Sequence, residues 1–314
     1  MPEFVTFGET MAVFAPCEAV PLRYCSDYKL RIAGAESNTA IGLAKLGHST
    51  GWISRLGDDE LGAYVLNSIR AEGVDTSSVI TDENHRTGLM VKQLSAGETS
   101  VFYYRENSAA SHFSKEDINF DAIKSAKIIH LTGITPVLGD SCMEACEEIV
   151  RFANENGIML SFDPNIRLRL WGNTDYTEKI ASFMYSSSIV LLGLDEAKRL
   201  TGTDKPVEIV NNLRQKGVRY IAIKNGSDGA WCADDTELIH IGAESCRCVD
   251  PVGAGDGFNA GFISGILRGK PLEICGKMGA IAGAMATENT GDIEGYPTLS
   301  QMNTRLNKTD VIYR

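Results

Sequence analysis

The chain has 314 residues, of which 43% are hydrophobic and 23% are charged, and its formal net charge is −11 at pH 7. A chain of this size can bury a large core, either as one big α/β domain or as a domain with an appendage. The negative charge and the lack of a basic block argue against nucleic acid or an anionic membrane as the main partner, so an anionic ligand would need local arginine or lysine.

The N-terminal and cysteine patterns bear on the compartment. Residues 1–5 show no basic region followed by an apolar one, and no run of 18 apolar residues occurs, so we expect a cytoplasmic protein with no membrane partner. The eight cysteines include no C-x-x-C, and the pairs Cys142/Cys146 and Cys246/Cys248 have helix and strand spacing. We expect buried, reduced thiols, with metal ligation as the weaker alternative.

The first motif, Gly34 to Asn38, precedes a predicted helix over 39–46. Gly34 would allow close approach to the backbone, and the Asn38 amide can donate and accept hydrogen bonds, which suits recognition of a hydroxyl. A simple helix cap is the alternative. A second helix is predicted over 59–72, since Leu61, Val65 and Ile69 share one face.

Two segments, about 13–32 and 87–106, interrupt the α/β pattern. The second is predicted to be a β-hairpin with strands over 87–94 and 99–105. We interpret the two segments as a lid over a ligand cleft. A plain edge hairpin on the main sheet is the alternative.

The hairpin carries large side chains on both faces. Strand periodicity places Val101, Tyr103 and Arg105 on one face and Phe102 and Tyr104 on the other. A small hairpin is not stable in water with apolar side chains exposed on both faces. We therefore expect one face to cover the cleft and the other to meet a partner subunit in a homo-oligomer.

From residue 127 onward, short apolar runs alternate with helical patterns. The predicted strands are 128–131, 158–162, 189–192 and 218–223, and the predicted helices between them are 141–156 and 206–216. This alternation is typical of a mostly parallel sheet with helices on both faces.

Polar residues follow several of these strands, at the edge where open α/β sheets bind ligands. Asp163, Asn165 and Arg167 follow the strand over 158–162. Arg167 offers a fork to a carboxylate or phosphate, and Arg105 could add a second cation from the lid. Either could instead be a surface arginine.

Two further loops follow strands. The Lys224 to Gly229 loop could pass beneath a nucleobase, or it could be a hairpin turn into 230–233. Gly193 begins a loop in which Glu196 could hold Mg²⁺ through water, or could be an ordinary first-turn glutamate.

The glycine-rich turn over 250–255 is the most informative motif. It joins a strand-like run over 246–249 to a predicted helix over 257–268. The glycines and the free first-turn N–H groups suit a phosphate, and Asp256 suits a general base that the helix dipole keeps ionised at neutral pH. An N-cap role for Asp256 is the alternative.

Rival nucleotide motifs receive little support. The pattern G-x-x-x-x-G-K-[ST] does not occur, which disfavours a P-loop enzyme. Residues 255–260 match G-x-G-x-x-A, but they come late in the chain, whereas a dinucleotide fold usually carries this motif after an early strand.

Together these motifs resemble those of the ribokinase-type, or PfkB, carbohydrate kinase family, over essentially the whole chain. Residues 250–256 (DPVGAGD) resemble its D-T-x-G-A-G-D signature with Pro251 for Thr, and residues 34–38 resemble its G-G-x-x-x-N signature with Ala35 for the second Gly. Within the family, the chain is most similar to the 2-keto-3-deoxygluconate kinases, in segments 7–11, 34–38, 103–105, 108–111, 131–136 and 163–167.

The resemblance implies one ribokinase-like, doubly wound α/β domain over 1–314, with a small inserted β-sheet lid at about 13–32 and 87–106 that often forms the dimer contact. It implies ATP- and Mg²⁺-dependent phosphorylation of the 6-hydroxyl of 2-keto-3-deoxygluconate, and it allows a monovalent cation such as K⁺. A fructokinase or other neutral-sugar kinase is the alternative. A non-catalytic nucleotide-binding protein and an NAD-dependent oxidoreductase are more distant alternatives.

The resemblance also assigns site residues. The sugar-acid contacts are Gly34, Asn38, Tyr103, Tyr104, Arg105, Arg167, Asp256 and Asp292. The nucleotide contacts are Asn165, Gly193, Lys224, Asn225, Gly226, Ser227, Asp228, Gly229, Ala230, Gly253, Ala254 and Gly255. Asp256 would act as base beside the amides of Gly253, Ala254 and Gly255. Glu196 would meet Mg²⁺ through water, although Gly193 stands where many members carry Asn.

Overall fold

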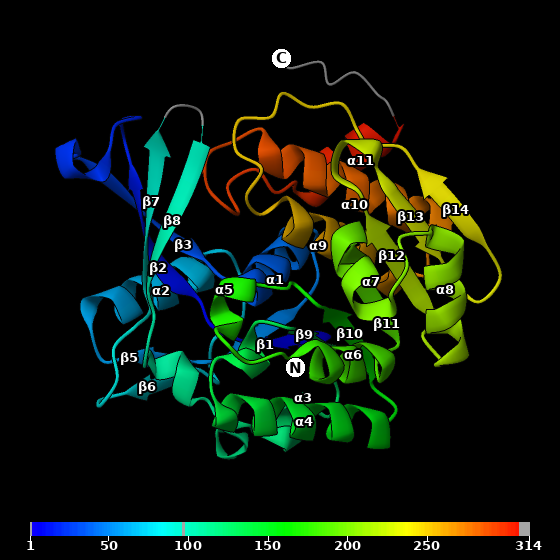
Figure 1. Cartoon of the computed structure of the whole chain (residues 1–314), viewed down its shortest axis with the longest axis horizontal. Helices are drawn as coiled ribbons and strands as arrows, with labels where there is room; N and C mark the ends of the chain where they lie inside the picture. The colour runs from blue at the N-terminus through cyan, green and yellow to red at the C-terminus, as the bar shows by residue number, and fades with distance from the viewer. Residues whose placement is uncertain (1, 96–97, 308–314) are drawn as a thin grey trace.

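The structure is a computed structural model that describes residues 2–95 and 98–307. Its centre is an eight-stranded sheet in the order β14-β13-β12-β11-β10-β9-β1-β4 (Figure 1). The strands are β1 (Phe4–Phe7), β4 (Thr50–Ile53), β9 (Ile128–Thr132), β10 (Met159–Asp163), β11 (Ile189–Gly193), β12 (Tyr220–Lys224), β13 (Ala230–Ala233) and β14 (Leu238–Ile241). The strands from β4 to β12 are parallel, and β13 and β14 are added antiparallel at one edge.

The parallel strands are apolar along their length because both faces of the sheet are covered. In β11, for example, Val190 and Leu191 are both fully buried but belong to different hydrophobic clusters. Side chains on a strand alternate between faces, so the two clusters lie on opposite sides of the sheet. This confirms the predicted parallel, doubly covered sheet.

Helices form the two outer layers. The helices α1 (Ala35–Lys45), α9 (Ala254–Leu267) and α10 (Leu272–Thr287) pack on one face, together with α2 (Glu60–Ala71). The helices α4 (Asp140–Glu155), α6 (Thr177–Tyr185), α7 (Leu194–Thr201) and α8 (Pro206–Gln215) pack on the other. The remaining helices are α3 (Phe120–Ile123), α5 (Leu168–Trp171) and α11 (Leu299–Asn307), with 3₁₀ turns at 22–24, 109–112, 115–117, 135–137 and 226–228.

A separate four-stranded sheet stands beside the main one (Figure 1), and we call it the small sheet. Its order is β3 (Tyr28–Ala33), β2 (Met11–Pro16), β7 (Leu89–Ser95) and β8 (Glu98–Tyr104). The predicted hairpin is therefore confirmed as β7 and β8, but it does not join the main sheet as the alternative required. A two-stranded sheet, β5 (Arg55–Gly57) and β6 (Ile80–Asp82), lies at its base.

One predicted strand was wrong. Residues 246–249 form a loop, because the backbone N–H groups of Val249 and Asp250 donate to the Thr287 carbonyl at the end of α10, at 2.7 and 3.1 Å, and to no neighbouring strand. The following helix also starts earlier than predicted, at Ala254 instead of Gly257. The start of the glycine turn is thus hydrogen-bonded to the C-terminal end of α10.

The prediction that the cysteines are buried was partly wrong. All eight cysteines are free, and Cys142, Cys146, Cys232 and Cys275 are buried. The exposed ones include Cys246 and Cys248, because their segment is a loop and not a strand. Within the described ranges, no helix has the length and apolar character needed to cross a membrane.

Candidate functional site

Two cavities meet at the glycine turn. Cavity A, of about 550 Å³, lies between the small sheet, the start of α1 and the segment that follows β10. Cavity B, of about 770 Å³, lies between α9, α10 and the loop after β12. Gly253 and Asp256 line cavity A, and Ala254 and Gly255 line cavity B. The turn is therefore a wall that the two cavities share.

The turn is built on a glycine that no other residue could replace without strain. Gly253 has φ +81°, and a Cβ added to it would lie 2.2 Å from the carbonyl oxygen of Asp292. The Tyr296 hydroxyl donates to the Gly253 carbonyl at 2.9 Å. This packing fixes the first turn of α9, whose N–H groups have no earlier helical carbonyls to bond. The free N–H groups that the sequence analysis associated with an anion therefore lie at the boundary of the two cavities.

Asp256 is the third residue of α9, so the N-cap alternative is wrong: the N-cap is Gly253. Its carboxylate oxygen Oδ2 accepts a hydrogen bond from Asn38 Nδ2 at 2.8 Å. Asn38 comes from α1, on a distant part of the chain. The two predicted residues therefore meet in cavity A.

The expected ionisation of Asp256 was wrong. Burial raises the pKa of Asp256 to about 7, and the nearby carboxylates of Asp163 and Asp292 add to the rise, although Asn38 and Lys224 oppose it. A helix N-terminus favours a carboxylate by roughly 0.3–1 kcal/mol, less than one pKa unit, so desolvation wins. Asp256 becomes a much better proton acceptor than an ordinary aspartate.

The predicted arginines line cavity A together, but their charges are not equivalent. Arg105 forms an ion pair with the buried Glu9, whose other oxygen accepts from Ser108 Oγ at 2.6 Å. Arg167 is exposed in the same cavity and has no ion-pair partner among the described residues. Glu9 therefore already balances the charge of Arg105, and Arg167 is the unpaired cation of the two.

Asp292 also lines cavity A, although its carboxylate is occupied by protein groups. Its Oδ1 lies 3.0 Å from Lys92 Nζ and its Oδ2 3.4 Å from Asn38 Nδ2. Burial raises the pKa of Asp292, while Lys92 and Asn38 act against the rise. Its first contacts are thus with Lys92 and Asn38.

Gly34 and Tyr103 line cavity A as predicted, but Tyr104 does not. Tyr104 is 65% exposed and lies on the opposite face of β8, as strand alternation requires. It lines a hollow near α2 instead. The structure therefore does not bring Tyr104 together with the other predicted sugar contacts.

Cavity B gathers half of the predicted nucleotide residues. Its lining includes Lys224, Gly226, Ser227, Gly229, Ala254 and Gly255. A Cβ on Gly255 would meet only Lys224 Nζ, at 3.8 Å, so the missing side chain leaves the turn open to this cavity. The lining of cavity B also includes Cys246 and Cys248.

The other predicted nucleotide residues shape loops outside that lining. Asn225 Nδ2 donates to Asp228 Oδ2 at 3.1 Å, which closes the 3₁₀ turn over 226–228. Ala230 is buried in the β12–β13 hairpin, so the hairpin alternative for this loop is confirmed. Asn165, with φ +39°, and Gly193 also lie outside the lining of either cavity.

Glu196 is an ordinary glutamate in the first turn of α7, as the alternative prediction stated. Its two carboxylate oxygens accept from the N–H groups of Gly193 and Ile166, each at 2.7 Å. Burial and the charge of Asp163 raise the pKa of Glu196. Among the residues that the structure describes, no group of three His, Cys, Asp or Glu side chains could hold a metal ion.

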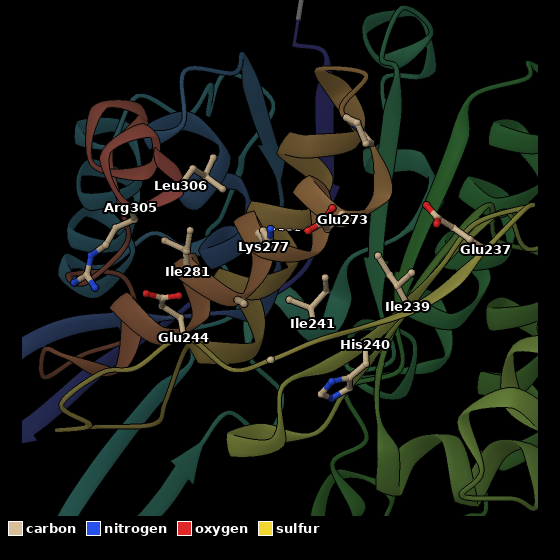
Figure 2. Close-up of a pocket in the computed structure, with 13 residues that line it drawn as sticks. Glu237, Ile239, His240, Ile241, Glu244, Glu273, Lys277, Ile281, Arg305 and Leu306 are labelled. Carbon is tan, nitrogen blue, oxygen red and sulfur yellow. Dashed lines mark hydrogen bonds and ion pairs between the residues drawn. The ribbon is translucent and has the colours of Figure 1, made fainter. Parts of the chain in front are cut away.

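Another hollow lies between β14, α10 and α11, with a volume of about 490 Å³ (Figure 2). Its charged residues include Glu273 and Lys277, which bond each other at 2.6 Å. None of the predicted site residues lines it. The candidate active site is therefore the pair of cavities at the glycine turn.

The family model of pfkB family carbohydrate kinases matches residues 1–299. The chain belongs to this family. As a pfkB family carbohydrate kinase, it is an enzyme of phosphoryl transfer, which argues against the oxidoreductase alternative.

Individual relatives support the assignment. The chain is 36% identical, over 99% of its length and 97% of the relative's, to the 2-dehydro-3-deoxygluconokinase of Bacillus subtilis (strain 168). It is 30% identical to fructokinase-2 of Solanum lycopersicum, over 96% and 95% of the two chains. The crystal structure of a PfkB protein from Polaromonas sp. JS666 is 34% identical and superposes with a TM-score of 0.89, over 96% of this chain and 99% of that one.

Three residues of this kinase site were missed from the sequence. Lys92 and Glu9 line cavity A, and Asn259 bridges Asp163 and Lys224 beneath the turn. Lys92 shares a strand face with Met90, and Asn259 interrupts an apolar helix, so a lone polar residue on an apolar face was the available signal.

Proposed function

We propose that the chain is an ATP-dependent kinase that phosphorylates the 6-hydroxyl of 2-dehydro-3-deoxygluconate, also called 2-keto-3-deoxygluconate. The observation that carries the proposal is the position of Asp256, in the wall between two cavities and beside a helix N-terminus. The 36% identity to a 2-dehydro-3-deoxygluconokinase supports the choice of substrate.

In this proposal, cavity A holds the sugar acid and cavity B holds ATP. Asp256 orients the 6-hydroxyl and accepts its proton, while the oxygen–γ-phosphorus bond forms and the bond to the β-phosphate oxygen breaks, releasing ADP. The N–H groups of Gly253, Ala254 and Gly255 stabilise charge on the migrating phosphoryl group. A base with a pKa near 7 is well matched to neutral pH.

The charge arrangement in cavity A favours an acid substrate over a neutral sugar. Arg167 offers a free guanidinium, and a sugar-acid carboxylate would supply its missing partner. Arg105, already paired with Glu9, would instead hydrogen-bond the sugar through its remaining N–H groups. Fructose would leave the charge of Arg167 unbalanced.

A panel of substrates tests this function. ADP release is measured with the keto acid, fructose and ribose at equal concentrations, and we expect the highest kcat/KM with the keto acid. The fructokinase alternative, which the 30% identical tomato enzyme represents, predicts a preference for fructose, and that result would refute the assignment.

We propose Mg²⁺ as a companion of ATP. Mg²⁺ in kinases is usually held by one or two carboxylates together with the substrate phosphates, and Glu196 has both oxygens engaged by backbone N–H groups. The ATP phosphates would then supply most of the ligands, with Glu196 acting through water. A need for K⁺ remains an expectation of the family, which replacement of K⁺ by tetramethylammonium in the assay would test.

We propose that residues 1–314 form one kinase domain in which the small sheet serves as lid and dimer contact. Met11, Val13, Ala33 and Met90 form a buried cluster on its inner face, and all of them except Val13 line cavity A. On its outer face, Phe102 is 45% and Tyr104 65% exposed, which is unusual for large apolar groups. We also expect the cytoplasm as the compartment, in keeping with eight free thiols.

A further inference from the structure

Lys92 is a buried lysine on the inner face of the small sheet. It lies on β7 and is only 5% exposed. Moving an ammonium group out of water costs several kcal/mol, so such a lysine persists only where nearby charges compensate it. Its charged partners therefore indicate its role.

Those partners lead from the small sheet to the catalytic carboxylate. Lys92 Nζ lies 3.0 Å from Asp292 Oδ1 and 3.7 Å from Asp250 Oδ2. Asp292 Oδ2 lies 3.4 Å from Asn38 Nδ2, and the same Nδ2 donates to Asp256 Oδ2 at 2.8 Å. Four segments that are distant in sequence are thus joined by three successive polar contacts.

We propose that Lys92 is a positioning residue which, through Asp292 and Asn38, holds the Asp256 carboxylate in place for proton transfer. The inference rests on the proposed role of Asp256 as base. It assigns Lys92 a function that does not depend on contact with the sugar.

The charges around Asp256 support this role. Asp163 on β10 faces it and is paired with Lys224 on β12 at 2.8 Å, while Asp292 faces it from the loop after α10 and is paired with Lys92. Each of these two carboxylates is therefore paired with a lysine, and Lys92 also lies near Asp250. The remaining facing groups are Asn38 on α1 and the buried Tyr296 hydroxyl, so loss of Lys92 would leave the charge of Asp292 uncompensated.

The pH dependence of turnover tests the proposal with the variants K92M and K92R. We expect K92M to lower kcat about 10- to 100-fold at pH 7, because the base is misplaced. The acidic limb of the pH profile of kcat should move to higher pH by about half to one unit, because an unpaired negative neighbour favours the protonated form of Asp256. K92R keeps the charge and should restore the limb. K29M is the matched control, since Lys29 lies exposed on the neighbouring strand β3, and it should behave as the wild type.

Two outcomes would overturn the inference. A K92M enzyme with a lower Tm but an unmoved acidic limb would make Lys92 merely structural. An increase in KM for the keto acid alone, with kcat and its limb unchanged, would make it a substrate contact. If K92M does not fold, D292N replaces it: removal of that carboxylate charge should move the limb to lower pH, and an unmoved limb would refute the coupling. Full turnover in D256N would instead refute the proposed base itself, so the two failures are distinguishable.

Discussion

At Asp256, the loss of water around a carboxylate outweighs both a helix N-terminus and a hydrogen bond from Asn38. The raised pKa of Asp256 suits the proton transfer that we propose, while the burial of its charge destabilises the fold. Stability and chemistry therefore make opposite demands on this residue.

Turnover by the variant D256N tests the proposed catalytic role. If Asp256 is the base, the amide cannot accept the proton, and we expect kcat to fall about 10²- to 10⁴-fold. Binding of ATP, measured by calorimetry, should stay within about threefold because cavity B is unchanged. Turnover within about tenfold of the wild type would contradict the base assignment.

The same variant should be more stable than the wild type at alkaline pH. The pKa of Asp256 rises from 3.8 to about 7 on folding, so the native state binds the proton more tightly, and stability falls as pH rises between these values. At pH 8, we expect D256N to be more stable by on the order of 1–3 kcal/mol. Urea unfolding at pH 8 and pH 4 measures this, and an advantage that persists at pH 4 would argue against the titration of Asp256.

Arg167 should act on substrate affinity. Because a charged hydrogen bond contributes roughly 1.5–3 kcal/mol, R167A should raise KM for the keto acid about 10- to 100-fold with little change in kcat. The control is R219A, which removes an exposed arginine paired with Asp235. Unchanged kinetics in R167A would refute the proposed carboxylate contact.

The sequence pattern placed Asn38, Arg167 and Asp256 after a strand or at a helix start, and the family resemblance assigned all three to the sugar acid. Cavity A brings them together. The ion-pair partners of the site residues were not predictable from the sequence. Glu9 forms an ion pair with Arg105, and Lys92 forms one with Asp292, and each pair joins segments that are more than 90 residues apart in the sequence. Such contacts depend on packing that no local pattern specifies.

At the scale of elements, the glycine turn connects the preceding loop to the first turn of α9. Its conformation depends on a left-handed residue pressed against the Asp292 carbonyl. The turn therefore belongs to both the active site and the packing of the C-terminal loop.

G253A tests that dependence against a matched glycine. Both Gly253 and Gly73 have φ above +80°, but a Cβ on Gly73 would meet nothing within 4 Å. G73A should cost only the backbone strain of about 1 kcal/mol. G253A should cost more and should also lower kcat at least about 100-fold, because the anion site moves. Equal stability losses and retained activity would show that the turn tolerates displacement.

Elements with regular periodicity were predicted well, and those held by tertiary contacts were not. The strands near 128–131, 189–192 and 218–223 are present because long apolar runs need a doubly covered sheet. The run over 246–249 has strand-like residues, yet Thr287 takes its backbone N–H groups. A short run without a free sheet edge beside it remains a loop.

At the scale of the whole molecule, the outer face of the small sheet should bury Phe102 and Tyr104 in a dimer. F102E would place a charge in that interface, and we expect monomers by light scattering at micromolar concentrations. V207E, at a residue 58% exposed on α8, is the control and should leave the mass unchanged. A wild-type monomer at these concentrations would refute the proposed contact.

The wall that the two cavities share has a thermodynamic consequence. Because Gly253 and Asp256 line one cavity while Ala254 and Gly255 line the other, a shift of this single turn would alter both of the proposed binding sites. Linkage then requires that each ligand change the affinity for the other by the same factor. In the proposed kinase, the glycine turn would thus let an empty cavity A weaken the binding of nucleotide in cavity B.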